Sequence, residues 1–277
     1  MSKIGITFAI YNNINYTIKC LNSILNNNSK NDLYIVVVNN ASTDGSAQLI
    51  LSEYSNVKII NNTTNLGCAR AWNQGLLDCK QNNCDYFVLT QNDVIISNGI
   101  LDRSVNFLND NKNIKLVSPF TINVSHESKK NMTQDDLNIV AEKAMRQYVG
   151  CVHRFFCMYF FMMMPEIFDK YPFDEIFKKA LYEDTDFYTA LALDRVLSCS
   201  AIDVGLMFHR HSATQAIARN SDPIGNKIYY EKKWGGRQKD AELGYGEIID
   251  NININMNYPT DKTGVFFNVE ESGFFKW

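Results

Sequence analysis

The chain has 277 residues, of which 45% are hydrophobic and 21% are charged, and its formal net charge is -3. This length and composition fit one large globular domain, or one domain with an appendage, and the weak negative charge argues against nucleic acid as the main ligand. Seven cysteines without any Cys-x-x-Cys pair argue against a zinc site or a disulfide framework, and predict reduced thiols in a cytosolic protein.

The first 90 residues alternate between short apolar runs and segments whose apolar residues have helical spacing. The runs, which are typical of buried strands in a parallel sheet, cover residues 4–10, 33–38, 57–60 and 86–89. The helical segments cover residues 16–25, 48–54 and 68–79. This alternation predicts βαβ units and an open α/β sheet.

Polar loops follow these four predicted strands, at residues 11–12, 39–46, 65–70 and 91–93. Right-handed crossovers place such loops at one edge of a sheet, so we expect them to converge on one crevice where a nucleotide would bind. The sequence contains no Gly-x-Gly-x-x-Gly or P-loop pattern, which argues against the common dinucleotide and P-loop binding modes.

The remainder of the chain carries weaker signals. We predict helices at residues 98–109, 166–170 and 182–193, and strands at residues 115–118, 155–164 and 197–204. Residues 119–149 are polar and aperiodic, which is typical of a functional loop or lid. From about residue 216 the sequence is rich in Asn, Gly and aromatic residues, so we divide the chain into a domain of residues 1–215 and a C-terminal extension of residues 216–277.

The N-terminus lacks the charged and apolar regions of a signal peptide. The longest apolar run, residues 155–165, is about half as long as a membrane span. We therefore expect at most peripheral association with a membrane.

Residues with a capacity for chemistry stand at three predicted element boundaries. Gln91-Asn92-Asp93 follows a buried strand, where an acid could hold a divalent metal against a phosphate, although a polar turn also explains these residue types. Glu183-Asp184-Thr185-Asp186 opens a helix, where acids also complement the helix dipole. His209 and His211 follow the last predicted strand, where an ordinary surface or hydrogen-bonded histidine explains either residue.

These segments, in this order and spacing, resemble the family 2 inverting glycosyltransferases of the GT-A fold. The resemblance spans roughly residues 4–236 and rests on residues 8–12, 37–46, 65–75, 91–93 and 183–186, and on His209 three positions before Ser212. It implies an open, twisted, mostly parallel sheet flanked by helices, a nucleotide-diphosphate sugar donor, and Mn²⁺ or Mg²⁺ as the cofactor. Residues 233–236 are also similar to tails in the bacterial polysaccharide branch, which includes rhamnosyltransferase-like members.

The resemblance implies roles for individual residues. Asp93 and His209 would bind the metal. Asp184 would be the catalytic base that takes the proton from the acceptor hydroxyl, Glu183 would position the acceptor, and Asp186 would be the substitute base. The residues that would bind the nucleotide are Ile10, Tyr11, Asn12, Asn39, Ser42, Asn65, Gly67, Arg70, Asn73, Gln91 and Asn92.

Two positions depart from the family pattern. Asn39 stands where the family has an aspartate that accepts a hydrogen bond from the uracil or thymine ring, and an uncharged amide oxygen accepts such a bond more weakly. Gln91 replaces the first acid of the Asp-x-Asp motif, which leaves one carboxylate fewer for the metal. Arg70 would offer a cation near the nucleotide, although an ordinary solvated charge also explains it.

The leading hypothesis is an inverting, metal-dependent transferase that moves a sugar from a UDP- or dTDP-sugar to a glycan or glycolipid acceptor. Its role would be cell-surface polysaccharide synthesis, in the cytoplasm or at the cytoplasmic face of a membrane. The alternative is a nucleotide-sugar-binding relative that has lost activity, which the replacements at positions 39 and 91 suggest. A nucleotidyltransferase would need a Gly-rich, basic loop after the first strand, where this chain has Tyr11-Asn12-Asn13. A homodimer through the aromatic tail remains a further alternative.

Overall fold

The computed structural model describes residues 1–123, 132–153, 156–210, 222–237 and 266–268. Within these residues the strands form one eight-stranded and one four-stranded sheet. In the part of the chain so described, no helix is both long and apolar enough to cross a lipid bilayer.

The large sheet is mostly parallel. Its N-terminal strands pair in parallel, whereas β9 runs antiparallel to both of its neighbours. In spatial order its strands are β3 (Val57–Asn61), β2 (Asp32–Asn39), β1 (Lys3–Ile10), β4 (Tyr86–Thr90), β9 (Phe160–Met163), β6 (Ile114–Ser118), β10 (Leu197–Ala201) and β8 (Val152–His153). The order of the small sheet is β12 (Phe266–Asn268), β7 (Phe120–Asn123), β11 (Leu206–His209) and β5 (Val94–Ile96).

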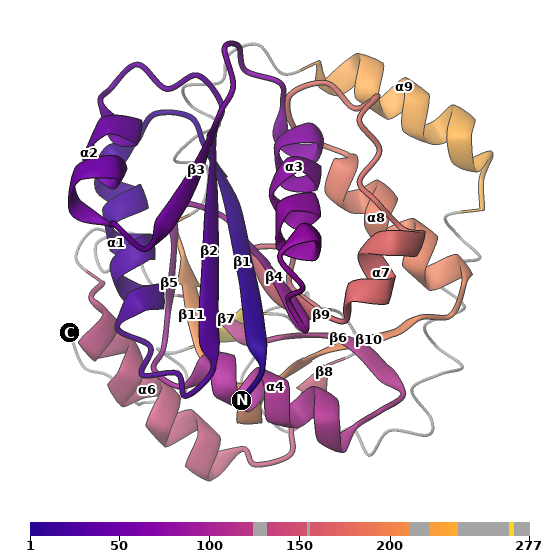
Figure 1. Ribbon diagram of the computed structural model, residues 1–277. Coiled ribbons are helices and arrows are strands. Elements are labelled where there is room, and N and C mark those ends of the chain that lie inside the picture. The colour runs from indigo at the N-terminus through magenta and orange to yellow at the C-terminus, as the bar shows by residue number, and fades with distance from the viewer. Residues whose placement is uncertain (124–131, 154–155, 211–221, 238–265, 269–277) are drawn as a thin grey trace.

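Helices cover both faces of the large sheet, as Figure 1 shows for its N-terminal part. The core on one face contains residues of α1 (Ile14–Leu25), α2 (Ser46–Glu53) and α4 (Ile100–Asp110). The core on the other face contains residues of α3 (Cys68–Gln81), α7 (Pro165–Lys170) and α8 (Glu183–Leu193). The continuous apolar runs of the strands follow from this arrangement, because a strand that is covered on both faces buries every side chain.

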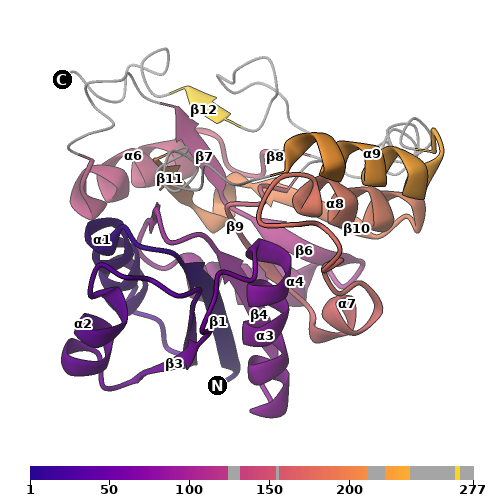
Figure 2. The same ribbon diagram turned by 90° about the horizontal axis from the view of Figure 1, so that it is seen from above.

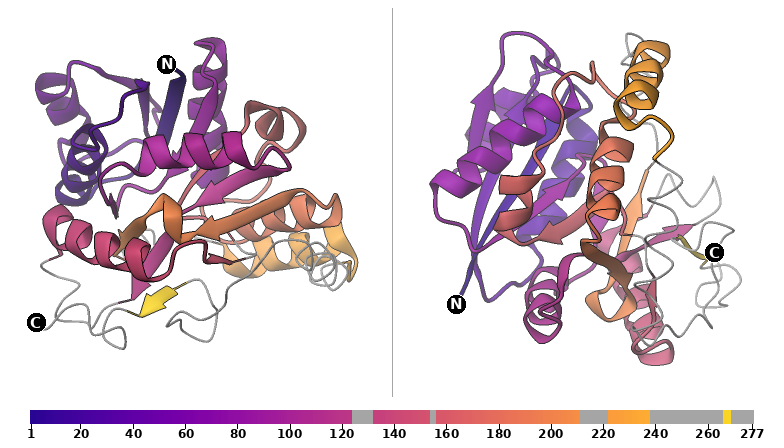
Figure 3. Two further views of the ribbon diagram at one scale, coloured as in Figure 1. Left: turned by 90° about the horizontal axis from the view of Figure 1, so that it is seen from below. Right: turned by 90° about the vertical axis from the view of Figure 1, so that its right-hand side faces the viewer.

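A third core lies between the small sheet and α6 (Gln134–Gln147). Figure 2 shows α6 near β7 and β11, and α9 (Pro223–Trp234) alongside α8. Figure 3 shows the same pairing of α8 and α9 from two further directions. A short 3₁₀ helix, Ile202–Val204, links β10 to β11.

The helix α3 approaches β1 unusually closely at one point. A Cβ atom added to Gly75 in α3 would overlap the Thr7 side chain in β1. This close approach requires glycine, although glycine lowers helix propensity by about 1 kcal/mol. It brings the middle of α3 against the sheet.

The predicted βαβ units and the mostly parallel sheet are confirmed, with small shifts at the ends of elements. The prediction of a long irregular segment at residues 119–149 is wrong, because this segment contains β7 and α6. Thr133 and Asp136 form a capping box at the start of α6. The buried face of α6 includes two alanines, which give a weaker apolar periodicity than larger side chains would give.

Two further strand predictions are corrected. The strand predicted at residues 155–164 is too long, because the observed strand β9 covers only Phe160–Met163. The strand predicted at residues 197–204 is also too long, because β10 ends at Ala201 and the 3₁₀ helix follows. The strands β5 and β11 were not predicted. Of the proposed extension, residues 216–277, the structure describes 222–237 and 266–268, where α9 lies along α8 and β12 pairs with β7. The division of the chain at residue 215 stays a prediction.

Candidate active site

The carboxyl ends of the N-terminal strands open into a cavity of about 240 Å³. All four predicted loops contribute residues to its wall, including Tyr11, Asn40 and Asn65, so the expected convergence on one crevice is confirmed. The predicted site residues that line the cavity are Ile10, Tyr11, Asn65, Gln91, Asn92, Asp93, Glu183, Asp184 and His209.

Three potential metal ligands meet in this cavity. The His209 Nε2 atom lies 3.1 Å from Asp93 Oδ1 and 3.1 Å from Gln91 Oε1. Asp93 and Gln91 follow β4, and His209 is the last residue of β11. They meet because β11 pairs antiparallel with β5, which places His209 opposite Val94.

The chemistry of this group fits a divalent cation. Carboxylate and amide oxygens suit Mn²⁺ or Mg²⁺, and imidazole suits Mn²⁺. Among the residues that the structure describes, no three His, Cys, Asp or Glu side chains lie close enough together to hold a metal ion on their own. A cation at Asp93 and His209 would therefore need the Gln91 oxygen, water or substrate phosphates to complete its coordination.

The two acids at the start of α8 differ in environment. Glu183 is only 5% exposed, and among the described residues its Oε2 atom has no hydrogen-bond partner. Burial and, secondarily, the nearby charge of Asp184 raise the pKa of Glu183 to about 8. Asp184 is partly exposed and lines the cavity. Glu183 is thus mostly protonated near neutral pH, which leaves Asp184 as the better candidate for a base.

Asp186 binds α9 rather than facing the cavity. It is 3% exposed and does not line the cavity. Its Oδ1 atom accepts a hydrogen bond from Trp234 Nε1 and its Oδ2 atom accepts one from Lys233 Nζ, both at 2.8 Å. This arrangement favours Asp184 over Asp186 as the base.

Other predicted nucleotide-binding residues stand behind the cavity wall. The Asn39 side chain accepts a hydrogen bond from Ser42 N, and the Ser42 hydroxyl accepts one from Asn12 N, both at 2.9 Å. Gly67 has a φ angle of 88°, and a Cβ atom there would lie 2.7 Å from Lys179 N. These contacts connect the loops that surround the cavity.

Arg70 and Asn73, on α3, also lie outside the cavity wall. Arg70 is exposed and faces Glu175 at 3.7 Å. The Asn73 amide exchanges hydrogen bonds with the backbone of Phe173 at 2.8 and 3.0 Å. In this structure, both side chains therefore bind the segment that precedes α8. The competing histidine, His211, lies outside the described residues.

The sequence interpretation missed several residues of the cavity wall. Tyr159 stacks on His209 with ring centroids 3.7 Å apart. Burial, followed by the neighbouring charges of Cys157, Asp184 and Asp93, raises the pKa of Tyr159 to about 12. A phenol within an otherwise apolar run was the available signal, because a buried tyrosine hydroxyl needs a polar partner. Trp72 and residues 179–181, which also line the cavity, carried no such signal.

Asp184 borders a second, wider groove of about 790 Å³. The opposite wall of this groove is α9, with Ile224, Lys227 and Ile228. Ile224 and Ile228 are 73% and 60% exposed. Asp184 thus stands between a cavity at the strand ends and an open groove with apolar side chains.

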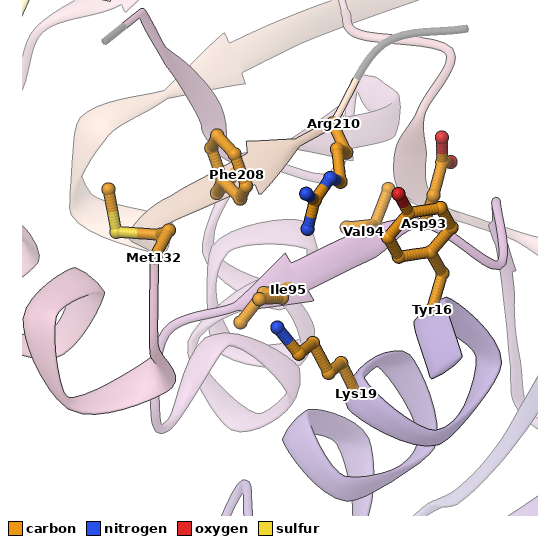
Figure 4. Close-up of a pocket in the computed structure, with 8 residues that line it drawn as sticks. All are labelled: Tyr16, Lys19, Asp93, Val94, Ile95, Met132, Phe208 and Arg210. Atoms are coloured by element: carbon orange, nitrogen blue, oxygen red, sulfur yellow. The ribbon is translucent and has the colours of Figure 1, made fainter. Parts of the chain in front are cut away.

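A much smaller pocket lies beside Asp93 (Figure 4). Arg210, which follows β11, and Lys19, on α1, point toward each other across Ile95. The Arg210 guanidinium carbon lies 4.6 Å from the centre of the Tyr16 ring. The pocket volume of about 10 Å³ accommodates at most about one water molecule, so it is not a substrate site.

Comparison with solved structures shows the same fold. A mannosyltransferase, PcManGT from Pyrobaculum calidifontis in complex with GDP-Man and Mn²⁺, is 17% identical, with a TM-score of 0.56 over 90% of this chain and 74% of its own. GalNAc-T7 with UDP, GalNAc and Mn²⁺ is 12% identical, with a TM-score of 0.65 over 87% of this chain and 49% of its own. S. aureus TarS 1–349 with UDP is 18% identical, with a TM-score of 0.54 over 87% and 72%.

The sequence comparisons identify the family. No curated protein matched the chain in a sequence search. A family model described as Glycosyl transferase family 2 matches residues 6–172, which is more than half of the chain. This match includes the four strand-end loops, and the GT-A fold of the structural neighbours agrees with it. The chain therefore belongs to glycosyl transferase family 2.

Proposed function

We propose that the protein is an inverting, metal-dependent transferase that moves a sugar from a UDP- or dTDP-sugar to a hydroxyl of a glycan or glycolipid. One observation carries the proposal. A single cavity brings the Asp93–His209 pair together with the acids Glu183 and Asp184. We further propose that it acts in cell-surface polysaccharide synthesis, in the cytoplasm or at the cytoplasmic face of a membrane.

Asp93 and His209, with the amide oxygen of Gln91, would hold Mn²⁺ or Mg²⁺. When bound, this ion would stabilise the negative charge that develops on the departing diphosphate. The strand-end loops would orient the nucleotide, with Tyr11 and Asn65 in the cavity wall. The coordination that the protein side chains leave open suits a diphosphate donor, because hard cations commonly share their ligand shell with substrate phosphates.

Asp184 would act as the general base. The acceptor oxygen attacks the anomeric carbon from the face opposite the diphosphate, and its proton passes to an Asp184 oxygen. The new carbon–oxygen bond forms as the bond between the anomeric carbon and the diphosphate oxygen breaks, so the configuration inverts. The acceptor would approach along the wider groove between α9 and the start of α8, because Asp184 borders both that groove and the cavity.

Glu183 would assist as a neutral acid. A carboxyl group that keeps its proton can donate a hydrogen bond to a ligand oxygen. The free Oε2 atom of Glu183 faces no partner among the described residues, so a sugar hydroxyl of either substrate could supply one. This supports the expected role of Glu183 in positioning the acceptor.

The second candidate is a relative that binds nucleotide sugars without transferring them. It is motivated by Asn39, whose oxygen already accepts from Ser42 N, and by Gln91, which occupies the position of an acid. This candidate predicts nucleotide binding without turnover of any sugar nucleotide.

The test is a binding titration of UDP, dTDP, GDP and CMP, each with Mn²⁺ and with a chelator. We expect tight binding of UDP or dTDP in Mn²⁺ only. Asp93→Ala should weaken that binding by about 100-fold, since even outer-sphere partners of a metal contribute about 10- to 100-fold, and should change little in chelator. Asp169→Ala, an exposed carboxylate paired with Lys80, is the matched control.

Three outcomes would contradict parts of the proposal. Equal binding of the nucleotide in Mn²⁺ and in chelator would exclude a role for the metal in donor binding. No binding of any nucleotide would exclude the transferase function. Binding without release of nucleotide diphosphate from any UDP- or dTDP-sugar, in the presence of glycan and glycolipid hydroxyl acceptors that can take the sugar, would select the inactive relative.

A further inference from the structure

The loop that delivers the two acids has an unusual backbone. Lys179, Leu181 and Tyr182 have φ angles of 65°, 80° and 75°, in the left-handed region that residues with a side chain rarely adopt. Such conformations persist only where the surrounding structure holds them in place. The loop lines the cavity through residues 179–181 and leads directly into Glu183 and Asp184.

The loop is held by a backbone hydrogen bond from Cys68 N to the Lys179 oxygen at 2.7 Å and by one side chain, Asn226. The Asn226 amide nitrogen lies 3.0, 3.1 and 3.0 Å from the carbonyl oxygens of Lys178, Ala180 and Leu181, so its two N–H groups are shared among three acceptors. The Asn226 oxygen accepts from Lys178 N at 3.0 Å. Asn226 is 3% exposed. An amide suits this position because it combines two N–H donors with an acceptor oxygen.

The helix that carries Asn226 is capped within itself at its start and bound to α8 at its end. At its start, the Asp222 side chain accepts a hydrogen bond from Gly225 N at 2.8 Å. At its end, Lys233 and Trp234 bind Asp186 on α8. The loop of residues 178–182 leads directly into α8. It is bound by Asn226 of α9, the helix that lies alongside α8 (Figures 2 and 3).

We infer that Asn226 is a positioning residue, which holds the loop of residues 178–182 in the left-handed conformation that sets Asp184 in the cavity. The inference rests on the proposed function for the role of Asp184 as the base. It extends that function to a helix far along the chain from the strand-end loops. Asn226 itself touches no substrate in this scheme and acts through the loop.

The experiment compares full-length wild type with Asn226→Asp, Asn226→Ala and the control Asp222→Ala. Asn226→Asp keeps the size and the acceptor oxygen but loses the donors and places a carboxylate against three carbonyl oxygens. Asp222→Ala weakens the start of α9 and leaves the Asn226 amide in place. Each variant is measured for amide hydrogen exchange of residues 178–185, for the Kd of UDP and dTDP in Mn²⁺, and for the kcat of nucleotide-diphosphate release from UDP- and dTDP-sugars.

We expect Asn226→Asp and Asn226→Ala to raise hydrogen exchange in residues 178–185 and to lower kcat by about 100-fold, the loss that a misplacement of about 1 Å can cause. The Kd of the nucleotide diphosphates, which we place at the strand ends, should change little. Asp222→Ala should resemble the wild type in both exchange and kcat.

A space-filling role for Asn226 predicts instead that Asn226→Asp behaves like the wild type, and this result would overturn the inference. Raised exchange with an unchanged kcat would also overturn it. If the wild type neither binds nor turns over any of these compounds, the proposed function fails, and the exchange comparison still confirms or rejects the hold of Asn226 on the loop.

Discussion

The two walls of the cavity are built in different ways. The strand-end wall consists of loops that directly follow β1 to β4, and the parallel register of the strands aligns them, with Ile10 opposite Asn39 and Asn39 opposite Asn61. The acidic wall consists of a strained loop and the start of α8, which bind residues that lie 45 and 48 positions later in the chain. The strand-end wall is thus determined by the sheet, whereas the acidic wall depends on a separate helix.

This difference predicts that the binding of nucleotide and the chemical step can be separated by mutation. Asp184→Asn should produce the largest effect, a loss in kcat of about 1000-fold, because a general base contributes about 10² to 10⁴. The Kd of UDP or dTDP should stay close to the wild-type value, since the change touches only the acidic wall. Turnover and nucleotide titration on the same preparation measure both.

Asp194→Asn, at the far end of α8, is a suitable control for this prediction. It removes a carboxylate that binds Lys170 and Tyr171 outside the cavity. Wild-type turnover in Asp184→Asn would show that another group takes the proton. A matching loss of nucleotide affinity would show that the two walls are not separable.

The raised pKa of Glu183 predicts that the stability of the protein depends on pH. The Glu183 pKa of about 8 in the folded protein lies above its ordinary value of 4.5, so the folded state binds more protons than the unfolded state between these values. The free energy of unfolding should therefore fall as pH rises through this window, by up to about 1.4 kcal/mol for each pH unit. Glu183→Gln should lack this slope, and its stability relative to wild type should grow toward pH 8.

Urea unfolding of both proteins at several values between about pH 5 and pH 8, in chelator, measures the slope. Parallel curves would mean that Glu183 is ionised in the folded protein and cannot act as a neutral donor. Aspartates of the strand-end wall are common to both proteins, so their titration cancels in the comparison.

The sequence predicted the strand-end wall well because its signals are local. An apolar run followed by a polar loop, repeated four times, is enough to place Tyr11, Asn65 and Asp93 at one edge. His209 came only from the family resemblance. Its contact with Asp93 depends on the antiparallel pairing of β5 and β11, which lie far apart in the chain. These strands are only three and four residues long. Apolar runs this short show too little periodicity to predict a strand.

The acidic wall shows the opposite case. The residues themselves placed Glu183 and Asp184 at the start of a helix, and the family resemblance gave these acids their expected roles, but nothing local indicates that Asn226 holds the loop before them. The left-handed residues Leu181 and Tyr182 lack the glycine that usually marks such a conformation, because tertiary hydrogen bonds stabilise it instead. The hydrogen bonds of Asp186 to Lys233 and Trp234 were not predicted for the same reason, since these partners lie 47 and 48 positions later in the chain.

The smallest predicted effect tests whether α9 is part of this wall or an appendage. The Lys233 ammonium lies 2.8 Å from both Asp186 and Asp174, with side-chain exposures of 28%, 5% and 19% respectively. Lys233→Met should lower the free energy of unfolding by about 2 kcal/mol, the range for hydrogen bonds to charged groups, because Asp186 would keep only its bond from Trp234. Lys227→Met removes an exposed ion pair with Glu231 on the same helix, and should change stability by at most about 0.5 kcal/mol. Urea unfolding of both variants decides the matter: equal small effects would make α9 a loosely attached extension, whereas a large effect of Lys233→Met alone would show that α9 is structurally integrated with the wall that carries the base.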